Sequence, residues 1–478
     1  MTSLVFSTLS GPLALESGVF GLLVIVLIVG LVMRGGAGRI PGAVALGGLV
    51  LLTVASFIMK AGSSALDGTF VVDDLALFAK RLFLASAALS VLAGLGLKAE
   101  SMSRRSTEYH VALLASLLGM LVVASARELI LFFVAFELMS IPLYFLTGFS
   151  KRDERAPEGA LKFFLVGSIS SAVILYGISF VYGATGLTAM SAIPAPLSAG
   201  NSLAMLGLGL MMAGLGFKIA AVPFHMWVPD TYEAAGTPFV AWLSIAPKAA
   251  GFVVIFRLYV EGVGEGAMLW IPAAAAVASV TILAGNLMAI PQKNIKRLLA
   301  YSGIAHIGYL LIGLAAMSIG GVGMMLFYLV AYLFGNMGAF FVVQAVADSE
   351  GSDDIDAYKG LARRSPALAL ALLVFLLSLG GIPFMAGFWA KLFIFWAVVQ
   401  NGMYWLAFLG AVATVVALYY YLVVASRMYI DAPAKPGRIP VPMPVLIAIL
   451  LCAAGVIGMG AYPEPWVQAA MRAAAVLF

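Results

Sequence analysis

Long apolar runs separated by short polar loops cover almost the whole chain. About fourteen runs have roughly the 18–25 residues that an α-helix needs to cross the hydrocarbon core of a bilayer. The expected spans lie near residues 17–34, 40–60, 75–97, 109–126, 128–150, 158–183, 201–235, 238–260, 268–290, 297–317, 321–346, 365–400, 404–428 and 441–462. The pattern predicts an all-α polytopic membrane protein that ends in a short amphipathic piece, 463–478.

Lysine and arginine residues gather in alternate loops between these spans. The loops after spans one, three, five, nine, eleven and thirteen are basic, with Arg34, Arg39, Lys98, Arg104, Arg105, Lys151, Arg152, Arg155, Lys293, Lys296, Arg297, Lys359, Arg363, Arg364, Arg427, Lys435 and Arg438. The loops after spans six, ten and twelve contain neither residue type. Because basic loops remain on the cytoplasmic side, the odd-numbered loops are predicted to be cytoplasmic and both termini to face the other side.

Two spans contain an interruption centred on a proline. Span seven includes GFKIAAVPFHMWVPDTYEAAGTP at 216–238, and span twelve includes LGGIPFMAGFWAKL at 379–392. As a straight helix, span seven would be about 50 Å long against a core of about 30 Å, so a broken and tilted segment fits better. The two interruptions are five spans apart and therefore cross in opposite directions. Such an arrangement is typical of inverted repeats whose broken helices meet near the bilayer midplane.

Five ionisable residues lie within the spans rather than at their ends: Glu137, Lys162, Lys218, Lys248 and Lys391. Charged side chains inside a membrane are costly and usually mark ion or proton pathways. A lysine buried near a carboxylate can exchange its proton near neutral pH, because the two influences act on its proton affinity in opposite senses. Metal cations would instead favour hard oxygen ligands. The set predicts a proton relay; the alternatives are static ion pairs and, for Lys162, a side chain that snorkels to the interface.

Two histidines lie close to these charges in the sequence. His225 is at the interruption of span seven, and His306 is in span ten. Imidazole titrates near neutral pH, so either residue could connect lysines in a relay. Either could equally be a hydrogen-bonded packing residue.

The composition agrees with a membrane protein and excludes other classes. Of 478 residues, 63% are hydrophobic and 10% charged, against about 25% charged in soluble domains. Basic cytoplasmic loops account for the net charge of +5, so it does not indicate nucleic-acid binding. The single cysteine, Cys452, cannot hold an iron–sulfur cluster, and the sequence has no phosphate-binding glycine motif and no metal-site spacing. We therefore expect no cofactor or metal in this chain.

Two motifs resemble those of the antiporter-like membrane subunits of respiratory complex I. The first is PFHMWVPDTYE at 223–233, and the second is QKNIKRLLAYS at 292–302, which runs into His306. Met226, with Asp230 and Thr231, is most similar to the subunit N branch of bacterial NADH:quinone oxidoreductases and differs from the sister subunits. The resemblance extends over essentially the whole chain.

The resemblance implies a proton-translocating membrane subunit of NADH:quinone oxidoreductase in a bacterial inner membrane. Glu137 and Lys218 would form a modulating pair, with Lys162 nearby. Lys248 would be the central relay lysine, and Lys391 would lie toward the outlet. NADH, FMN, iron–sulfur clusters and quinone would be bound by other membrane and peripheral subunits. The inverted repeats would be helices four to eight and nine to thirteen, which divides the chain into 1–105, 106–262, 263–430 and 431–478.

Related proteins share these motifs, which leaves alternatives. A cation/proton antiporter subunit of an Mrp-type or membrane hydrogenase complex would show sodium-dependent exchange without NADH. A structural scaffold with vestigial polar residues would tolerate neutralisation of Glu137 and all four lysines.

Overall fold

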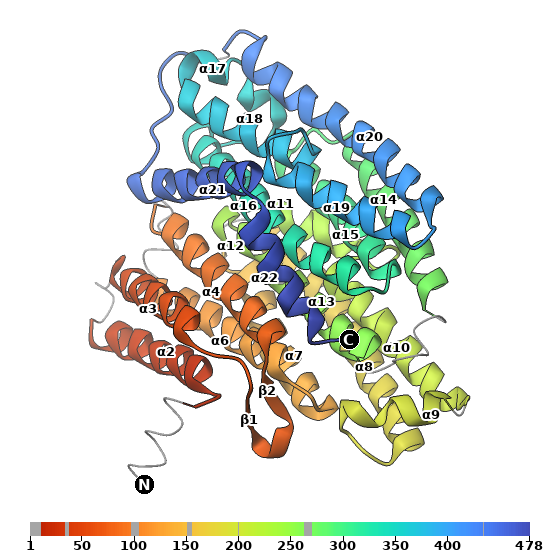
Figure 1. Ribbon diagram of the computed structural model, residues 1–478. Helices are drawn as coiled ribbons and strands as arrows, with labels where there is room; N and C mark the ends of the chain where they lie inside the picture. The colour runs from red at the N-terminus through yellow and green to blue at the C-terminus, as the bar shows by residue number, and fades with distance from the viewer. Residues whose placement is uncertain are drawn as a thin grey trace.

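The computed structural model describes residues 11–33, 38–96, 105–150, 155–198, 200–261, 270–433 and 435–478, and within them the chain is almost entirely helical (Figure 1). The helices are α2 Ala14–Val32, α3 Ile40–Ile58, α4 Asp74–Gly94, α6 Ser106–Ser125, α7 Leu129–Thr147, α8 Arg155–Thr185, α9 Pro194–Ser198, α10 Ser202–Ile219, α11 Trp227–Ala234, α12 Thr237–Leu243, α13 Ala246–Ile255, α14 Ile271–Ala289, α15 Ile295–Ala315, α16 Ile319–Glu350, α17 Leu361–Arg364, α18 Pro366–Gly380, α19 Ala386–Gln400, α20 Tyr404–Tyr429, α21 Met443–Ala461 and α22 Glu464–Ala475. The other elements are strands β1 Ser63–Ala65 and β2 Phe70–Val72, the short 3₁₀ helices η1 Leu66–Gly68, η2 Met190–Ala192 and η5 Ile355–Tyr358, and the π-helical turn η3 Phe256–Glu261.

The predicted all-α membrane fold is confirmed. Thirteen helical segments of the described chain are long and apolar enough to cross a membrane, and α18 with α19 form one further span from two shorter helices. The most apolar stretch of Thr237–Glu261, the segment that contains α12, α13 and η3, is completely buried, whereas α2, α3, α14 and α20 are each buried over a third or less of theirs. The central spans are therefore enclosed by other helices, and the peripheral spans leave apolar faces for lipid or for other subunits.

Span seven is broken between α10 and α11, as predicted. The first helix ends at Ile219 because Ala220 adopts a left-handed conformation with φ 65°, and the chain then passes through Val222 and Pro223. Pro223 has no backbone N–H to pair. The N–H of Val222 donates to the hydroxyl of Thr281 in α14 at 3.1 Å. Such side-chain partners satisfy backbone groups that a break exposes inside a membrane.

Span twelve is broken in the same way, and span eight has an interruption that we did not predict. Gly381, between α18 and α19, is left-handed with φ 83°. In span eight, α12 and α13 are separated at Ser244, whose hydroxyl accepts from the amide of Asn336 at 2.6 Å. Pro247 lies in the first turn of α13, where a missing N–H is tolerated. This proline was the sequence signal for the interruption, and it places Lys248 at the beginning of a helix rather than in its middle.

The order of the elements agrees with two five-helix repeats. The third helix of each set is long, with 31 residues in α8 and 32 in α16, and the fourth span of each set is broken. The proposed domain boundaries remain a prediction, and the boundary at 262–263 falls outside the described residues. So do five of the basic residues used to predict the orientation: Arg34, Lys98, Arg104, Lys151 and Arg152.

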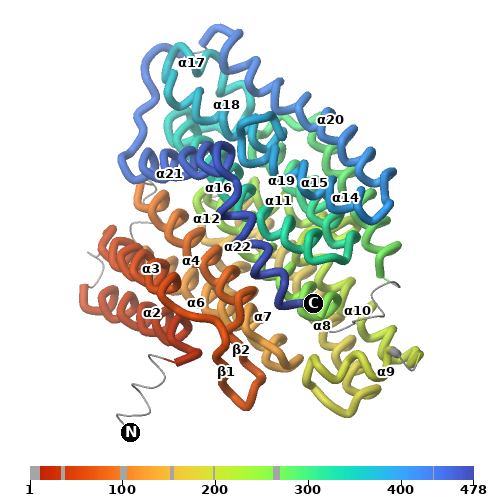
Figure 2. Tube along the Cα trace, viewed as in Figure 1, coloured from red at the N-terminus to blue at the C-terminus, as the bar shows by residue number. Residues whose placement is uncertain are grey.

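Two smaller features join parts of the bundle. The hairpin of β1 and β2 lies at the same end of the molecule as α9 (Figure 2), and bridges join Phe70 to Ala126 and Glu128 to Ala189. The C-terminal helix α22 crosses the bundle in front of α16 (Figure 1) and packs on both α16 and α4. The amphipathic tail expected from the sequence is therefore part of the folded core.

Candidate functional site

Lys218 lies in the last turn of α10, immediately before the helix break, and is buried. Its ammonium group donates to the hydroxyl of Ser140 in α7 at 2.6 Å and lies 4.8 Å from the ring centroid of Phe136. The C-terminal carbonyls of a helix and the face of an aromatic ring both favour a cation. The break therefore creates a buried site in which a lysine can carry charge.

Glu137 lies one turn from Ser140 on α7, so both face the same side of that helix. The half-buried carboxylate accepts a hydrogen bond from the hydroxyl of Ser171 in α8 at 2.5 Å. The Glu137 carboxylate on α7 and the Lys218 ammonium group on α10 are therefore each bonded to a serine rather than to each other.

Lys248 is buried to 1% exposure at the start of α13. Its ammonium group has no hydrogen-bond partner among the described residues and lies 5.5 Å from the ring centroid of Tyr232 in α11. The hydroxyls of Tyr232 and Tyr332 are also buried and unpaired within the described chain. A Cβ at Gly303 in α15 would lie 2.9 Å from the Tyr332 hydroxyl and 3.5 Å from the lysine nitrogen, so the close approach of these groups requires glycine there.

His306 in α15 lies between this region and Lys391, because its ring contacts Tyr332 on one side and lies 6.0 Å from Tyr309, the ring over which Lys391 is placed, on the other. Its Nδ1 lies 2.6 Å from the hydroxyl of Tyr328, its Nε2 lies 3.3 Å from the hydroxyl of Tyr421, and its ring stacks on Tyr332 at 4.7 Å between centroids. The Tyr421 hydroxyl is also bonded to Ser302. Hydroxyls and imidazole nitrogens each donate or accept, so the arrangement can pass a proton along its hydrogen bonds.

Lys391 belongs to α19, the second half-helix of span twelve, and its ammonium group lies at the C-terminal end of α18, the first half-helix. Its ammonium group donates to the carbonyls of Leu379 at 2.9 Å and Gly380 at 3.4 Å, the last carbonyls of α18. It also lies 4.6 Å from the ring centroid of Tyr309, whose hydroxyl accepts from Thr414 at 3.3 Å. In each broken span a lysine occupies the C-terminal end of the first half-helix, although it comes from that helix in span seven and from the next helix in span twelve.

Lys162 belongs to a different set of contacts. Its side chain is 48% exposed and forms ion pairs with Glu158 at 2.8 Å and Asp230 at 2.9 Å. Arg297 joins Asp230 to Glu233 with distances of 2.8 and 2.9 Å. The charged face of α11 is thus held at one end of the bundle, and the relay role of Lys162 remains a prediction.

His225 is half-buried in the break of span seven between Phe224 and Met226, which are both exposed. No hydrogen bond of its side chain joins it to a lysine within the described chain. Its relay role also remains a prediction.

The predicted count of five ionisable residues within the spans was too low. Lys80 in α4 is fully buried against Glu16 in α2 at 2.8 Å. Arg257, at the end of span eight, is buried and bonded to Asp73 at 2.7 and 2.8 Å. We missed these residues because they lie close to predicted span ends, where snorkelling to the interface is the usual outcome. The tyrosines around His306 gave no signal, because an aromatic residue in an apolar run reads as core.

Residues 126–417 match the family described as NADH:quinone oxidoreductase/Mrp antiporter, TM. A curated relative, NADH-quinone oxidoreductase subunit N from Heliobacterium modesticaldum, is 43% identical over 380 residues, which are 79% of this chain and 80% of that protein. This chain belongs to the NADH:quinone oxidoreductase/Mrp antiporter family.

Solved structures agree with the family assignment. A chain of respiratory complex I from Thermus thermophilus with bound aureothin is 32% identical, with a TM-score of 0.82 over 95% of this chain and 98% of that chain. A chain of the Mrp complex from Dietzia sp. DQ12-45-1b has a TM-score of 0.86 at 20% identity, over 98% of this chain and 97% of that chain, and so shows a shared fold alone.

The segment matched by the NADH:quinone oxidoreductase/Mrp antiporter family contains the whole buried row. Lys218, Lys248, His306 and Lys391 all lie between residues 126 and 417. The Glu16–Lys80 pair lies outside that segment. Among the described residues, no group of three or more His, Cys, Asp or Glu side chains is arranged to hold a metal ion.

Proposed function

We propose that this chain is a proton-translocating membrane subunit of an NADH:quinone oxidoreductase, in which quinone reduction in other subunits drives protons along the buried row. The observation that carries the proposal is the row itself. Lys218, Lys248 and Lys391 are each buried to 4% exposure or less, and His306 with its tyrosine hydroxyls lies between the last two. The relatives described above are subunit N of such an enzyme and a chain of respiratory complex I. Flavin, clusters and quinone would then be held by those partner subunits and not by this chain.

The three lysines have unequal partners for their charged forms, which supports a direction of transfer. Lys218 has one hydroxyl, Lys248 has no partner in the described chain, and Lys391 has two helix carbonyls. Lys248 would then carry a proton only transiently, between a site at one helix break and a better-stabilised site at the other. Hydrogen bonds from a charged group are worth about 1.5–3 kcal/mol each, enough to bias such a transfer.

Glu137 would couple this transfer to events elsewhere in the complex. Its carboxylate on α7 and the Lys218 ammonium group on α10 are bonded to different serines, so a small movement of α7 against α10 would bring the two charges together or move them apart. Moving one charge across a potential of 100 mV costs about 2.3 kcal/mol, and the coupling must supply at least that per proton.

We also propose that the chain lies in a bacterial inner membrane with both termini on the periplasmic side. The basic loops after spans nine, eleven and thirteen lie together: Asn294 bridges to Asp354, and the N–H of Gly360 donates to the carbonyl of Arg427 at 3.0 Å. A shared basic end is what the preference of Lys and Arg for the cytoplasmic side produces.

The test is Lys248→Met in the intact complex, since methionine keeps most of the side-chain volume and removes the charge. Proton translocation per electron in inside-out vesicles should fall, and NADH oxidation should become less dependent on the membrane potential. Lys293→Met, at an exposed lysine of a basic loop, is the matched control and should leave both quantities unchanged. A normal proton-to-electron ratio in Lys248→Met would refute the relay.

The alternative of a cation/proton antiporter subunit makes a different prediction. It requires sodium-dependent proton exchange in liposomes that contain the complex but no NADH. The lysine ammonium groups of the buried row repel a bound cation, which is why we favour the redox-driven pump.

A further inference from the structure

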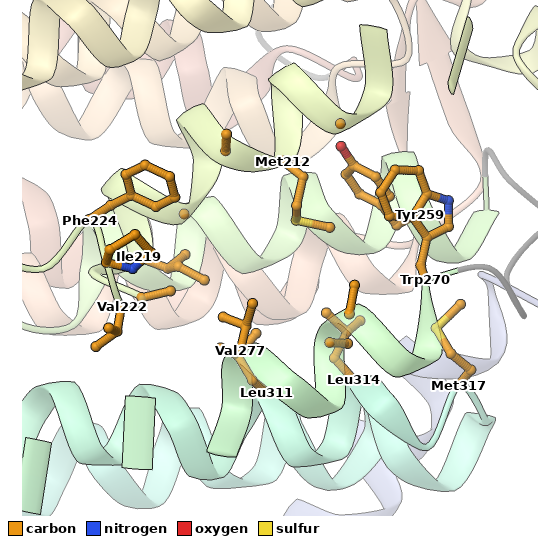
Figure 3. Close-up of a pocket in the computed structure, with 17 residues that line it drawn as sticks. Met212, Ile219, Val222, Phe224, Tyr259, Trp270, Val277, Leu311, Leu314 and Met317 are labelled. Carbon is orange, nitrogen blue, oxygen red and sulfur yellow. The ribbon is translucent and has the colours of Figure 1, made fainter. Parts of the chain in front are cut away.

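The break of span seven forms one wall of an apolar cavity of about 250 Å³ (Figure 3). The other walls come from α10, α14, α15 and η3. In Figure 3 the labelled side chains extend from Val222 and Phe224 at the break to Trp270 and Met317 at the far end. The family's buried row does not use this space.

Small residues create the space instead of closing it. Glycines in membrane helices normally permit close contact with a neighbouring helix. On α10, Gly207 and Gly214 do so, because an added Cβ would lie 2.7 Å from the carbonyl of Gly177 and 2.4 Å from Ile174 in α8. Gly209, on the cavity side of the same helix, would have nothing within 4 Å of an added Cβ. Across the cavity, α14 contributes Ala273 and Ala274 to the lining. Small residues on both helices therefore leave a space that no protein group fills.

The cavity has the length and depth of one membrane leaflet. Along α10 its lining runs from Gly209 to Ile219, about 15 Å at the helical rise of 1.5 Å per residue, and half of a hydrocarbon core is also about 15 Å. One end is the break between α10 and α11. The other end is marked by Trp270, which precedes α14, and Met317, which follows α15, at the membrane face opposite the basic loops. Tryptophan is typical of the boundary between hydrocarbon and headgroups.

The cavity is continuous with the exposed apolar surface of the chain. Val277 and Phe224 line it and are also 36% and 38% exposed, and their neighbours Val280 and Leu206 are 52% and 53% exposed. Its polar content is minimal: the Tyr259 hydroxyl already donates to the carbonyl of Leu208. A ligand with a buried polar head would therefore find few partners there.

We propose that this cavity binds one acyl chain of a membrane phospholipid, with the glycerol end near Trp270 and the methyl end against Val222 and Pro223. The lipid enters sideways from the leaflet opposite the basic loops. It packs against the helix break on the side opposite Lys218, and so supports the half-helix end that positions the lysine. The inference does not depend on proton translocation, since it rests on shape, depth and apolar lining.

Photo-crosslinking of the intact complex in nanodiscs tests the proposal. The probe is phosphatidylcholine, doped into phosphatidylethanolamine and phosphatidylglycerol, with a diazirine either close to the carboxyl end or close to the methyl end of one acyl chain. After illumination, mass spectrometry should locate the first probe at peptides that contain Tyr259, Trp270 or Met317. It should locate the second probe at peptides that contain Val222 to Phe224.

Substitutions that fill the cavity provide the control. Gly209→Phe and Ala274→Phe should each abolish labelling of these peptides, whereas Val280→Phe, on the lipid-facing surface of α14 outside the cavity, should leave it unchanged. Two filling variants are used so that a folding defect in one does not decide the result. Equal labelling by both probes at both ends, or labelling that the filling variants do not change, would overturn the proposal. So would crosslinks from Val277, replaced by a photoreactive amino acid, to another polypeptide instead of lipid.

Discussion

Asp73 joins three parts of the molecule, and its replacement tests how strongly they depend on one buried charge. Its carboxylate accepts from Arg257 at 2.7 and 2.8 Å, from Arg127 at 2.6 Å and from the N–H of Ala76 at 2.8 Å. The last bond caps the N-terminus of α4. Arg257 is 1% exposed in its side chain, so it has no access to solvent as a substitute partner. Asp73→Asn keeps the shape and the capping oxygen Oδ1, and it removes the charge together with the acceptor oxygen that Arg127 and Arg257 share.

The expected loss follows from the burial of the pair. Removing one partner of a buried ion pair costs about 3–5 kcal/mol, because the other charge is left uncompensated. Glu261 remains 3.5 Å from Arg257 and compensates in part, so we expect the free energy of unfolding to fall by about 3 kcal/mol, at the low end of that range. The measurement is unfolding of the purified chain in mixed detergent micelles by sodium dodecyl sulfate, followed by tryptophan fluorescence.

The loss should also depend on pH. Burial acts to raise the pKa of Asp73, but the hydrogen bonds and charge of Arg257, with Arg127, outweigh it, so the pKa lies below its ordinary value. The stabilisation is therefore complete above about pH 4, the ordinary value for an unfolded aspartate, and is lost as the pH falls through the lower folded value. The stability difference between wild type and Asp73→Asn should be constant between about pH 6 and 8 and shrink below about pH 4.

Asp74→Asn is the matched control, because it makes the same change one residue later at an exposed position. Asp74 lies in the first turn of α4 and should lose only its interaction with the helix dipole, about 0.3–1 kcal/mol. Equal losses for the two variants, or a difference for Asp73→Asn that persists unchanged at low pH, would refute the reasoning.

Three further predictions concern the buried polar groups. Gly303→Ala should lower proton translocation per electron in vesicles while the complex still assembles, whereas Gly458→Ala, whose added Cβ meets nothing within 4 Å, should change neither. Tyr328→Phe removes the hydroxyl that bonds the His306 imidazole and should slow proton-coupled turnover roughly tenfold, since an unpaired buried group costs about 1–3 kcal/mol. A normal rate would exclude the Tyr328 hydroxyl from the relay. Lys80→Met should lower the free energy of unfolding by about 3–5 kcal/mol, and Lys80→Met with Glu16→Leu should recover most of it. A double variant as unstable as the single one would contradict this.

The two helix breaks suit the proposed proton transfer because they expose backbone groups that a continuous helix pairs internally. A half-helix ends inside the membrane with unpaired carbonyls, and in hydrocarbon these need a partner. Lys391 supplies it for α18 from across the break. Lys218 is placed at the equivalent end of α10 by its own helix. The lysine precedes the proline in span seven and follows it in span twelve, but in both spans its ammonium group lies at the C-terminal end of the first half-helix.

The membrane fold could be derived from the sequence because it follows from local properties. Run length sets the number of spans, and Pro223 and Pro383 mark two of the breaks. The interruption before Lys248 was less evident, because a proline in a first turn and one inside a helix look alike in a sequence. The candidate lysines could be named for the same reason: a charge in an apolar run is conspicuous.

The number of spans, the sites of the two main breaks and three of the buried lysines, Lys218, Lys248 and Lys391, follow from the sequence alone. The groups that surround them became known from the packing of the helices: a serine at each of Glu137 and Lys218, tyrosines around His306, and helix carbonyls at Lys391. It also decided that Lys80 is paired inside the bundle and that Lys162 is held at its edge. The physical reason is that hydropathy does not distinguish between the many ways in which apolar helices of similar composition can pack together. The environment of a polar group depends on which helices meet, and that is settled by side-chain packing over the whole bundle.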